Sequence, residues 1–223
     1  MKILKTYSGK KSHKRDLFDK KDLEILLEKL RPHPQPHISL EQYTIPSETA
    51  SEILFTAGCI FDDIRGKRIV ELGCGTGRLA LGASAIGAKE VIGVDIDPLA
   101  VWAAKKNQQE VKNHGRIQWI ISDIDCIQGK FDTALQNPPF GVQRRGADRR
   151  FIEKALTIAK TIYSLHKTDP KNRVFIKRFV DENGGKITDL FQLKFKIPWT
   201  FSFHTKRVQT IKVDLYRMES KCQ

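Results

Sequence analysis

The stretch KRIVELGCGTG, residues 67–77, decides the fold of this chain. Its first half is a β-branched run that predicts a buried strand, and its second half places Gly73, Gly75 and Gly77 in a turn. The small-residue run RLALGASAIGA follows the turn and reads as a helix. Glycines between a strand and a helix let the backbone pass close to a ligand, and the N–H groups that begin the helix are free to bind it.

The rest of the chain repeats this alternation of strand and helix. Further strands are predicted at 90–95, 117–122, 131–135 and 161–166, and further helices at 97–115, 148–160 and 169–185. Two longer strands, 186–197 and 208–218, have no helix between them, so they should pair antiparallel, and one of them can insert at the sheet edge. The pattern predicts an α/β fold with a doubly wound, mainly parallel seven-stranded sheet whose last strands are antiparallel.

Residues 1–37 are predicted to form a basic N-terminal extension, and residues 38–223 the main domain. Leucines recur at helical spacing within residues 23–30, which indicates an amphipathic helix. The segment RPHPQPH after it alternates proline and is typical of an extended connector. Its His33 and His37 have no other metal ligands near them in the sequence, so no metal site is predicted.

Composition narrows the classes of function. The 223 residues contain no apolar run long enough to span a membrane and no secretory leader, so a soluble, cytoplasmic protein is expected. A net charge of +13 favours a polyanionic partner, with nucleic acid ahead of an anionic membrane; a solvated basic tail is the alternative for the first 21 residues. The four cysteines lack metal-binding spacing and are expected to be reduced thiols.

Two acidic residues follow the next two strands at the edge where the glycine turn lies. Asp95 ends the second strand, where a carboxylate can accept hydrogen bonds from both hydroxyls of a ribose. Asp123 ends the third strand and is placed to reach an adenine amine. The turn has the spacing GxGxG and not the GxGxxG of dinucleotide sites, so S-adenosylmethionine fits better than a dinucleotide. As the alternative, both aspartates merely cap the helices that follow them.

The segment FDTALQNPPFG, residues 131–141, ends the fourth strand at the same edge. The Asn137 side-chain oxygen and the Pro138 carbonyl can accept the two N–H groups of a planar amine such as adenine N6, which aims the nitrogen lone pair at a methyl donor. Pro138 and Pro139 hold the loop rigid, and Phe140 can stack on the base. A tight loop around a core phenylalanine is the alternative.

Four arginines follow this loop in the segment VQRRGADRR. Arg144, Arg145, Arg149 and Arg150 lie where they can hold the phosphates that flank the reacting base. An adenine inside a stacked helix cannot react, so the substrate base must be single-stranded or turned out. A solvated loop is the other interpretation of this run.

Taken together, these motifs resemble the eukaryotic adenosine-N6 methyltransferases that modify small-subunit ribosomal RNA, and the chain looks like an archaeal relative of that family. The resemblance covers roughly residues 39–217 and rests on LEQY (40–43), ELGCGTG (71–77), GVDID (93–97), FDTALQNPPFG (131–141), YSLHK (163–167), FHTKR (203–207) and VDL (213–215). It implies a Rossmann-like class I methyltransferase fold, S-adenosylmethionine as the donor and an RNA adenosine as the acceptor. It also implies, as a candidate partner, a small zinc-binding activator protein that covers an apolar sheet edge.

The residues and the resemblance together predict the site. Catalysis is expected from Asn137, Pro138, Pro139 and Phe140. Cofactor binding is expected from Gln42, Glu71, Gly73, Gly75, Thr76, Gly77, Arg78, Asp95, Ile96, Asp123, Ile124 and Asn137, with Gln42 carried over from the family's LEQY segment, which closes over the cofactor.

Two other functions stay open. Protein-glutamine N5 methyltransferases and DNA adenine methyltransferases use a similar Asn-Pro-Pro-aromatic loop, because a side-chain amide is also a planar, weakly nucleophilic amine. The glutamine enzymes usually carry a helical substrate domain, for which the roughly 65 residues before the first strand leave little room. A non-catalytic RNA-binding or ribosome-assembly factor on the same fold is the third reading, although the intact motifs argue against lost chemistry.

Overall fold

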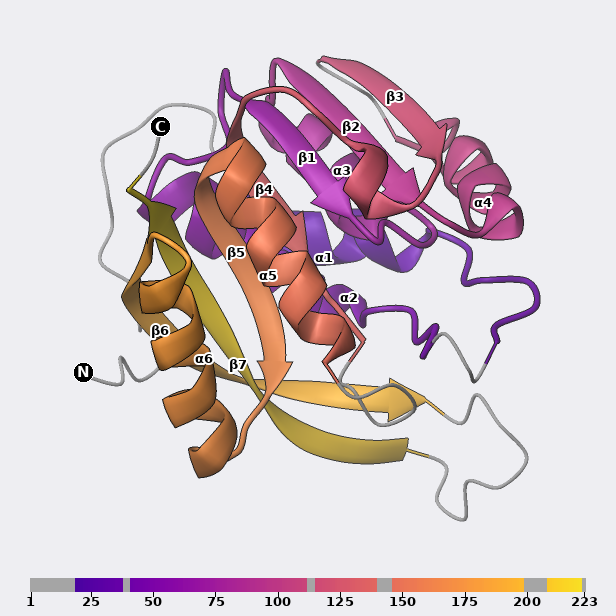
Figure 1. Ribbon diagram of the computed structural model, residues 1–223. Helices are drawn as coiled ribbons and strands as arrows, with labels where there is room; N and C mark the ends of the chain where they lie inside the picture. The colour runs from indigo at the N-terminus through magenta and orange to yellow at the C-terminus, as the bar shows by residue number, and fades with distance from the viewer. Residues whose placement is uncertain (1–18, 38–40, 112–114, 140–145, 199–207, 222–223) are drawn as a thin grey trace.

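The computed structural model describes residues 19–37, 41–111, 115–139, 146–198 and 208–221 (Figure 1). Its centre is a seven-stranded sheet with the order β3-β2-β1-β4-β5-β7-β6. The strands are β1 (Arg68–Leu72), β2 (Glu90–Asp95), β3 (Arg116–Ile121), β4 (Phe131–Gln136), β5 (Ala159–Lys167), β6 (Gly185–Pro198) and β7 (Val208–Ser220). β1 to β5 are parallel, and β7 lies antiparallel between β5 and β6. The predicted fold class is confirmed.

Helices cover both faces of the sheet. They are α1 (Lys20–Glu28), α2 (Ser47–Phe55), α3 (Arg78–Ile86), α4 (Pro98–Gln108), α5 (Ala147–Ile158) and α6 (Pro170–Glu182), with a π-helical turn η2 (Thr56–Ile60) and a 3₁₀ turn η3 (Ile124–Cys126). One core cluster joins α1, α2 and α3 to one face, and a second joins α5 and α6 to the other (Figure 1). None of the described helices is long and apolar enough to cross a membrane.

The N-terminal helix is part of the core. Leu23, Leu27 and Leu30 are buried in the same cluster as Leu54 of α2 and Leu81 of α3. Burial of three leucines in this way stabilises the fold by roughly 5 to 9 kcal/mol before the entropy cost of ordering the segment. α1 therefore fixes the start of the proline-rich connector against the main sheet, while a domain boundary at residue 37 stays a prediction.

Several elements differ from the sequence prediction, among them one helix that was not predicted and two helices that end early. α2 and η2 were not predicted, because Pro46 at the N-cap supplies no side-chain hydrogen bond and buried polar residues such as Thr49 and Ser51 blur the amphipathic pattern. α4 ends at Gln108, earlier than predicted. α5 ends at Ile158, because Ala159 is extended (φ −128°, ψ 147°) and pairs with β4 as the first residue of β5.

Candidate active site

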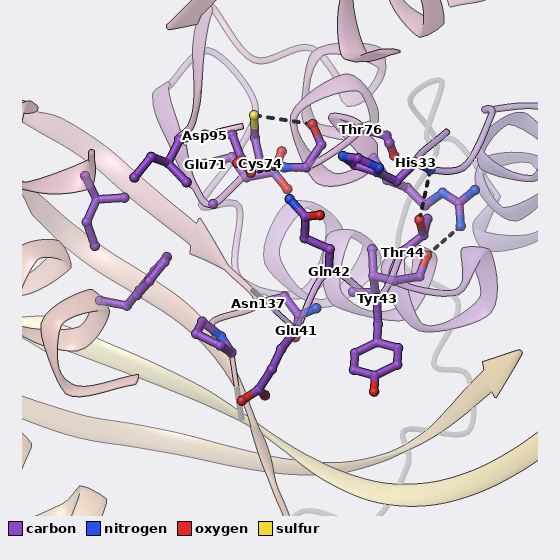
Figure 2. Close-up of a pocket in the computed structure, with 18 of the residues that line it drawn as sticks. His33, Glu41, Gln42, Tyr43, Thr44, Glu71, Cys74, Thr76, Asp95 and Asn137 are labelled. Atoms are coloured by element: carbon purple, nitrogen blue, oxygen red, sulfur yellow. Dashed lines mark hydrogen bonds between the residues drawn. The ribbon is translucent and has the colours of Figure 1, made fainter. Parts of the chain in front are cut away.

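A cavity of about 390 Å³ lies at the carboxyl ends of β1, β2 and β4 (Figure 2). Residues 41–45 form its opposite wall, and Gln42 points from there toward the glycine turn and Asp95. A volume of this size falls within the ~300–1,000 Å³ range of small-molecule sites. In open α/β sheets such sites form at this edge, outside the carboxyl ends of the strands.

Most predicted site residues meet in this cavity. Those that line it are Gln42, Glu71, Gly73, Gly75, Thr76, Arg78, Asp95, Ile96, Asp123, Ile124, Asn137 and Pro139. Gly77 and Pro138 are not among its lining residues, and Phe140, Arg144 and Arg145 lie outside the described residues. A Cβ at Gly77 would lie 2.3 Å from the Trp119 ring, so this glycine serves the packing of β3 against the turn.

The glycine turn is open to the cavity at Gly75. This residue has φ +51°, a conformation that favours glycine, and a Cβ built on it would meet nothing within 4 Å. Its N–H donates to Asp95 Oδ2 at 2.7 Å. The turn is thus tied to the end of β2, with its backbone exposed to whatever occupies the cavity.

Asp95 presents a buried carboxylate to the cavity. Oδ2 accepts from the Gly75 N–H and Oδ1 from the Asp97 N–H at 2.9 Å, and only 9% of the residue is exposed. Burial raises the pKa of this carboxyl, and the two N–H bonds oppose that rise. A carboxylate has about four acceptor positions, so positions remain for ribose hydroxyls. The helix cap is the neighbouring Asp97, which accepts from the Leu99 N–H at 2.8 Å.

Asp123 caps the turn that follows it and also lines the cavity, while its contact with an adenine amine stays a prediction. Its Oδ1 accepts from the Asp125 N–H at 3.0 Å, which caps η3, and from Arg150 Nη2 at 2.8 Å. The backbone bond and the guanidinium lower the pKa of Asp123, so it is ionised at neutral pH. It also lines the cavity, and Arg150 stands at the cavity rim beside it.

Glu71 closes the floor of the cavity at the end of β1. It is 4% exposed, and its Oε2 accepts from the Ala80 N–H in the first turn of α3 at 2.7 Å. Burial raises the pKa of Glu71 well above its usual range. The side chain thus links the end of β1 to the start of α3 and holds the intervening turn in place.

Two side chains that the sequence reasoning did not assign hold the connector against this turn. His33 Nε2 lies 3.0 Å from Asp97 Oδ2. Asn107, fully buried in α4, accepts from the Arg31 N–H at 2.8 Å and donates to the Thr76 carbonyl at 3.1 Å. Arg78 adds to this link, because its guanidinium donates to the Leu30 and Ile45 carbonyls. The proline-rich connector is therefore fastened to the glycine turn by side-chain hydrogen bonds.

Gln42 is expected to control cofactor affinity through this wall. Its Nε2 donates to Asp97 Oδ2 at 2.7 Å. A hydrogen bond to a charged group contributes about 1.5–3 kcal/mol, so Gln42→Ala should loosen the 41–45 wall and weaken S-adenosylmethionine binding about tenfold. Titration calorimetry measures this, with the melting temperature as control. An unchanged Kd would show that the wall does not depend on this bond.

Asn137 contributes to the site a side-chain oxygen that has no hydrogen-bond donor among the described residues. Its Oδ1 is buried and has no hydrogen-bond partner among the described residues. A buried amide oxygen without a partner costs about 1–3 kcal/mol, so such an atom is a binding position in need of a donor. Together with the open cradle at Gly75 and the acceptor positions of Asp95, it makes the cavity fit a nucleoside donor beside an amine acceptor.

This fold and this site define a class I methyltransferase, the class whose methyl donor is S-adenosylmethionine. A family model, the methyltransferase small domain, matches residues 48–160. A zebrafish protein, the rRNA N(6)-adenosine-methyltransferase METTL5, is 33% identical and is aligned over 88% of this chain and 97% of its own. An uncharacterised protein of Methanocaldococcus jannaschii is 39% identical, over 91% and 95%. The chain belongs to the methyltransferase small-domain family and, within it, to the group of METTL5 and its archaeal relatives.

Solved structures agree with this assignment. A crystal structure from Pyrococcus horikoshii, named provisionally as an RNA methyltransferase, superposes with a TM-score of 0.83 at 41% identity, covering 92% of this chain and 98% of that one. A magnesium protoporphyrin IX methyltransferase of Synechocystis with bound S-adenosylmethionine has a TM-score of 0.58 at 16% identity, and shares the fold alone.

Proposed function

We propose that the chain transfers a methyl group from S-adenosylmethionine to the exocyclic N6 of an adenosine in RNA, expected to be small-subunit ribosomal RNA, in the cytoplasm. The observation that carries this proposal is the buried, unpartnered Asn137 Oδ1 at the end of β4, next to the cavity. An adenine amine has the N–H group that this oxygen needs. The names of the METTL5 relatives from zebrafish, fruit fly and nematode point to the same reaction.

In this proposal the protein acts by position and electrostatics. The Asn137 oxygen and the Pro138 carbonyl accept the two N6 hydrogens, which turns the nitrogen lone pair out of the ring. Asp95 would hold the ribose of the donor, and the Gly75 turn would lie against its amino-acid tail. When bound, the donor supplies an electrophilic methyl group on a sulfonium. The bond between N6 and the methyl carbon would form as the bond between that carbon and the sulfonium sulfur breaks, which leaves a neutral thioether. N6 becomes acidic in this step and can lose its proton to water, so no strong base is needed.

The assay that tests the proposal offers the protein labelled S-adenosylmethionine with small subunits, and separately with naked ribosomal RNA, from a strain that lacks the gene. Nucleoside analysis should place the label in N6-methyladenosine. Label in another nucleoside, or in protein, would contradict the proposal. The pair of substrates also shows whether the enzyme acts on RNA alone or on the assembled subunit.

A lysine pair on the long hairpin is expected to contribute to RNA binding. Lys194 of β6 and Lys212 of β7 are exposed and lie directly opposite each other, one position beyond the Lys167–Val213 pair that ends β5. Like charges opposite each other destabilise a sheet, and a phosphate between them removes that cost. Replacing both by alanine should raise KM for RNA and reduce the slope of log K against log salt by about 1.5 to 2.

The matched control for that pair is Lys89→Ala with Lys130→Ala. Both lysines are exposed, and each immediately precedes a strand, Lys89 before β2 and Lys130 before β4. They therefore lie at the amino ends of the strands, on the side of the sheet away from the cavity. This variant has the same net charge as the Lys194 and Lys212 variant. Equal loss of affinity in the two variants would mean that RNA responds to total charge and not to the hairpin.

We also propose a small zinc-binding activator protein as a partner at the outer edge of the sheet. β3 is an edge strand, and apolar side chains near it are exposed: Ile121 by 53%, Trp102 by 56% and Leu99 by 42%. Contiguous exposed apolar side chains are typical of interaction sites. Co-expression with such a protein should raise the yield of soluble, active enzyme, and no change in yield or activity would count against it.

Protein glutamine is the second candidate acceptor. A protein of Methanocaldococcus jannaschii, named provisionally as a protein N5-glutamine methyltransferase, is 40% identical over 79 residues, although this stretch is only 35% of the chain. The Asn137 oxygen could accept from a glutamine amide just as it would from adenine. Label in a protein band of the subunit in the same assay would favour this reaction.

A further inference from the structure

A chain of buried polar side chains lies directly behind the Asn137 position. Gln136 Nε2 donates to Ser164 Oγ at 2.9 Å, and Ser164 Oγ lies 2.7 Å from His166 Nε2. The three residues are between 0% and 2% exposed. Gln136 of β4 and Ser164 of β5 are paired in the sheet. This series of hydrogen-bonded side chains therefore runs from one strand to the next near the carboxyl end of β4. The reaction as proposed does not use any of these groups.

The directions of these hydrogen bonds follow from the chemistry of the groups. The Gln136 amide donates to Ser164 Oγ, and the buried serine hydroxyl hydrogen itself needs an acceptor. We assign His166 Nε2 as that acceptor, because it lies 2.7 Å from Oγ and burial disfavours the protonated imidazole. In this assignment the ring hydrogen is on Nδ1. Nδ1 lies 3.9 Å from Asp148 Oδ2 in the first turn of α5.

The buried surroundings of His166 exclude water and thereby disfavour the protonated imidazole. Burial lowers its pKa to about 3, against the opposing charge of Asp214 on β7. Asp214 is itself held by Arg173 of α6 at 2.7 Å, and the Tyr216 ring meets the imidazole edge on. Burial also raises the pKa of Asp148. The imidazole thus remains an acceptor for Ser164 throughout the range of pH in which the enzyme would work.

Gln136 and Asp148, at the two ends of this series of polar side chains, lie on either side of the Asn-Pro-Pro loop in the sequence. Gln136 immediately precedes Asn137, and Asp148 is the second residue of α5, the helix that follows the loop. The Oε1 atom of Gln136, like Oδ1 of Asn137, is buried without a partner among the described residues. Among the residues that the structure describes, Ser164 supplies the hydrogen bond that orients the Gln136 side chain.

We propose that Ser164 and His166 are positioning residues for Asn137: they fix Gln136, and through it the point where the backbone leaves β4 for the Asn-Pro-Pro loop. This role rests on the proposed methyl transfer. It predicts that loss of the Ser164 hydroxyl lowers kcat, because the acceptor oxygen is displaced, while binding of the donor is unchanged.

The test compares two neighbouring hydroxyls on β5. Ser164→Ala removes the hydroxyl behind Asn137, whereas Tyr163→Phe removes one on the other face of the sheet, where it donates to Asp63 Oδ2 at 2.7 Å. Both residues are buried. Ser164→Ala should lower kcat about tenfold or more, with KM and the donor Kd little changed, because small displacements of reacting groups are costly. Tyr163→Phe should lower the melting temperature and leave kcat unchanged.

A second pair of variants keeps the proposal testable if Ser164→Ala folds poorly. His166→Gln retains an acceptor near the position of Nε2 and should keep most of kcat, whereas His166→Leu removes it and should behave as Ser164→Ala. Equal kcat in these two variants, or an equal loss of kcat in Ser164→Ala and Tyr163→Phe, would overturn the positioning role. A wild-type protein without methyl transfer to RNA would instead overturn the proposed function, and this role with it.

The pH dependence of stability gives a readout that does not depend on activity. Below about pH 6.5 the unfolded chain takes up a proton on His166 that the folded chain does not, so stability falls as pH is lowered. This one group should change the unfolding equilibrium constant about tenfold per pH unit between about pH 6 and 3. His166→Gln should remove that share of the slope, and an unchanged slope would show that the imidazole is not kept neutral.

Discussion

Replacing Asn137 by alanine is expected to lower kcat for methyl transfer at least about 100- to 1,000-fold, the loss found when one oriented hydrogen-bonding group is removed from the reacting atoms. The Asn137 oxygen is buried and has no partner among the described residues, so its loss leaves the fold nearly as stable as before. Steady-state assays with labelled donor measure kcat, and single-turnover assays measure the rate of methyl transfer itself. Titration calorimetry should show nearly unchanged binding of S-adenosylmethionine, because Gly75 and Asp95 are intact.

Asn137→Asp is the matched control for this variant. A carboxylate retains an acceptor oxygen at the same position, so part of the activity should return. The new carboxyl would lie in a partly buried site that raises its pKa, and a protonated carboxyl is a poorer acceptor. The activity of Asn137→Asp should therefore increase with pH over a range in which that of wild type does not. Wild-type turnover in Asn137→Ala would contradict the two-acceptor mechanism.

The fold could be predicted because its signals are local. β2 has the predicted bounds, and α4 and α6 begin one residue after the first residues of their predicted ranges, Asp97 and Asp169, which cap the two helices. The order of the sheet follows from the alternation of strand and helix, and from the two final strands that lack a helix between them. α2 could not be predicted in the same way, because it is buried around most of its circumference and its residues lack helical periodicity.

The site residues that could be predicted from the sequence are those at the carboxyl ends of strands. Asp95 is the last residue of β2 and Asn137 follows β4, and the carboxyl ends of parallel strands meet on one side of the sheet in any such fold. His33 and Asn107 could not be found, because their partners Asp97 and Arg31 are 64 and 76 residues away in the sequence. An asparagine within a helix and a histidine in a proline-rich connector have no sequence signal that identifies their partners.

Gly75 and Gly77 of the turn are expected to show different roles when each is replaced by alanine. Gly77→Ala places a methyl group 2.3 Å from Trp119, whose ring is also close to Gly93 and whose Nε1 donates to Gln108 at 2.7 Å. The ring therefore cannot move aside. Overpacking adds about 1–3 kcal/mol to the roughly 1–2 kcal/mol of a left-handed alanine, so unfolding should occur about 10 °C lower.

Gly75→Ala carries the same kind of backbone strain without the clash, since a Cβ there meets nothing within 4 Å. The methyl group would instead occupy space at the cavity, so donor binding should weaken more than about tenfold while the melting temperature falls by only a few degrees. Gly66→Ala (φ +69°, no neighbour within 4 Å, remote from the cavity) measures the strain alone. If Gly75→Ala matched Gly66→Ala in donor affinity, the turn would not be the surface against which the donor lies. If Gly77→Ala matched Gly66→Ala in stability, Trp119 would have found another position.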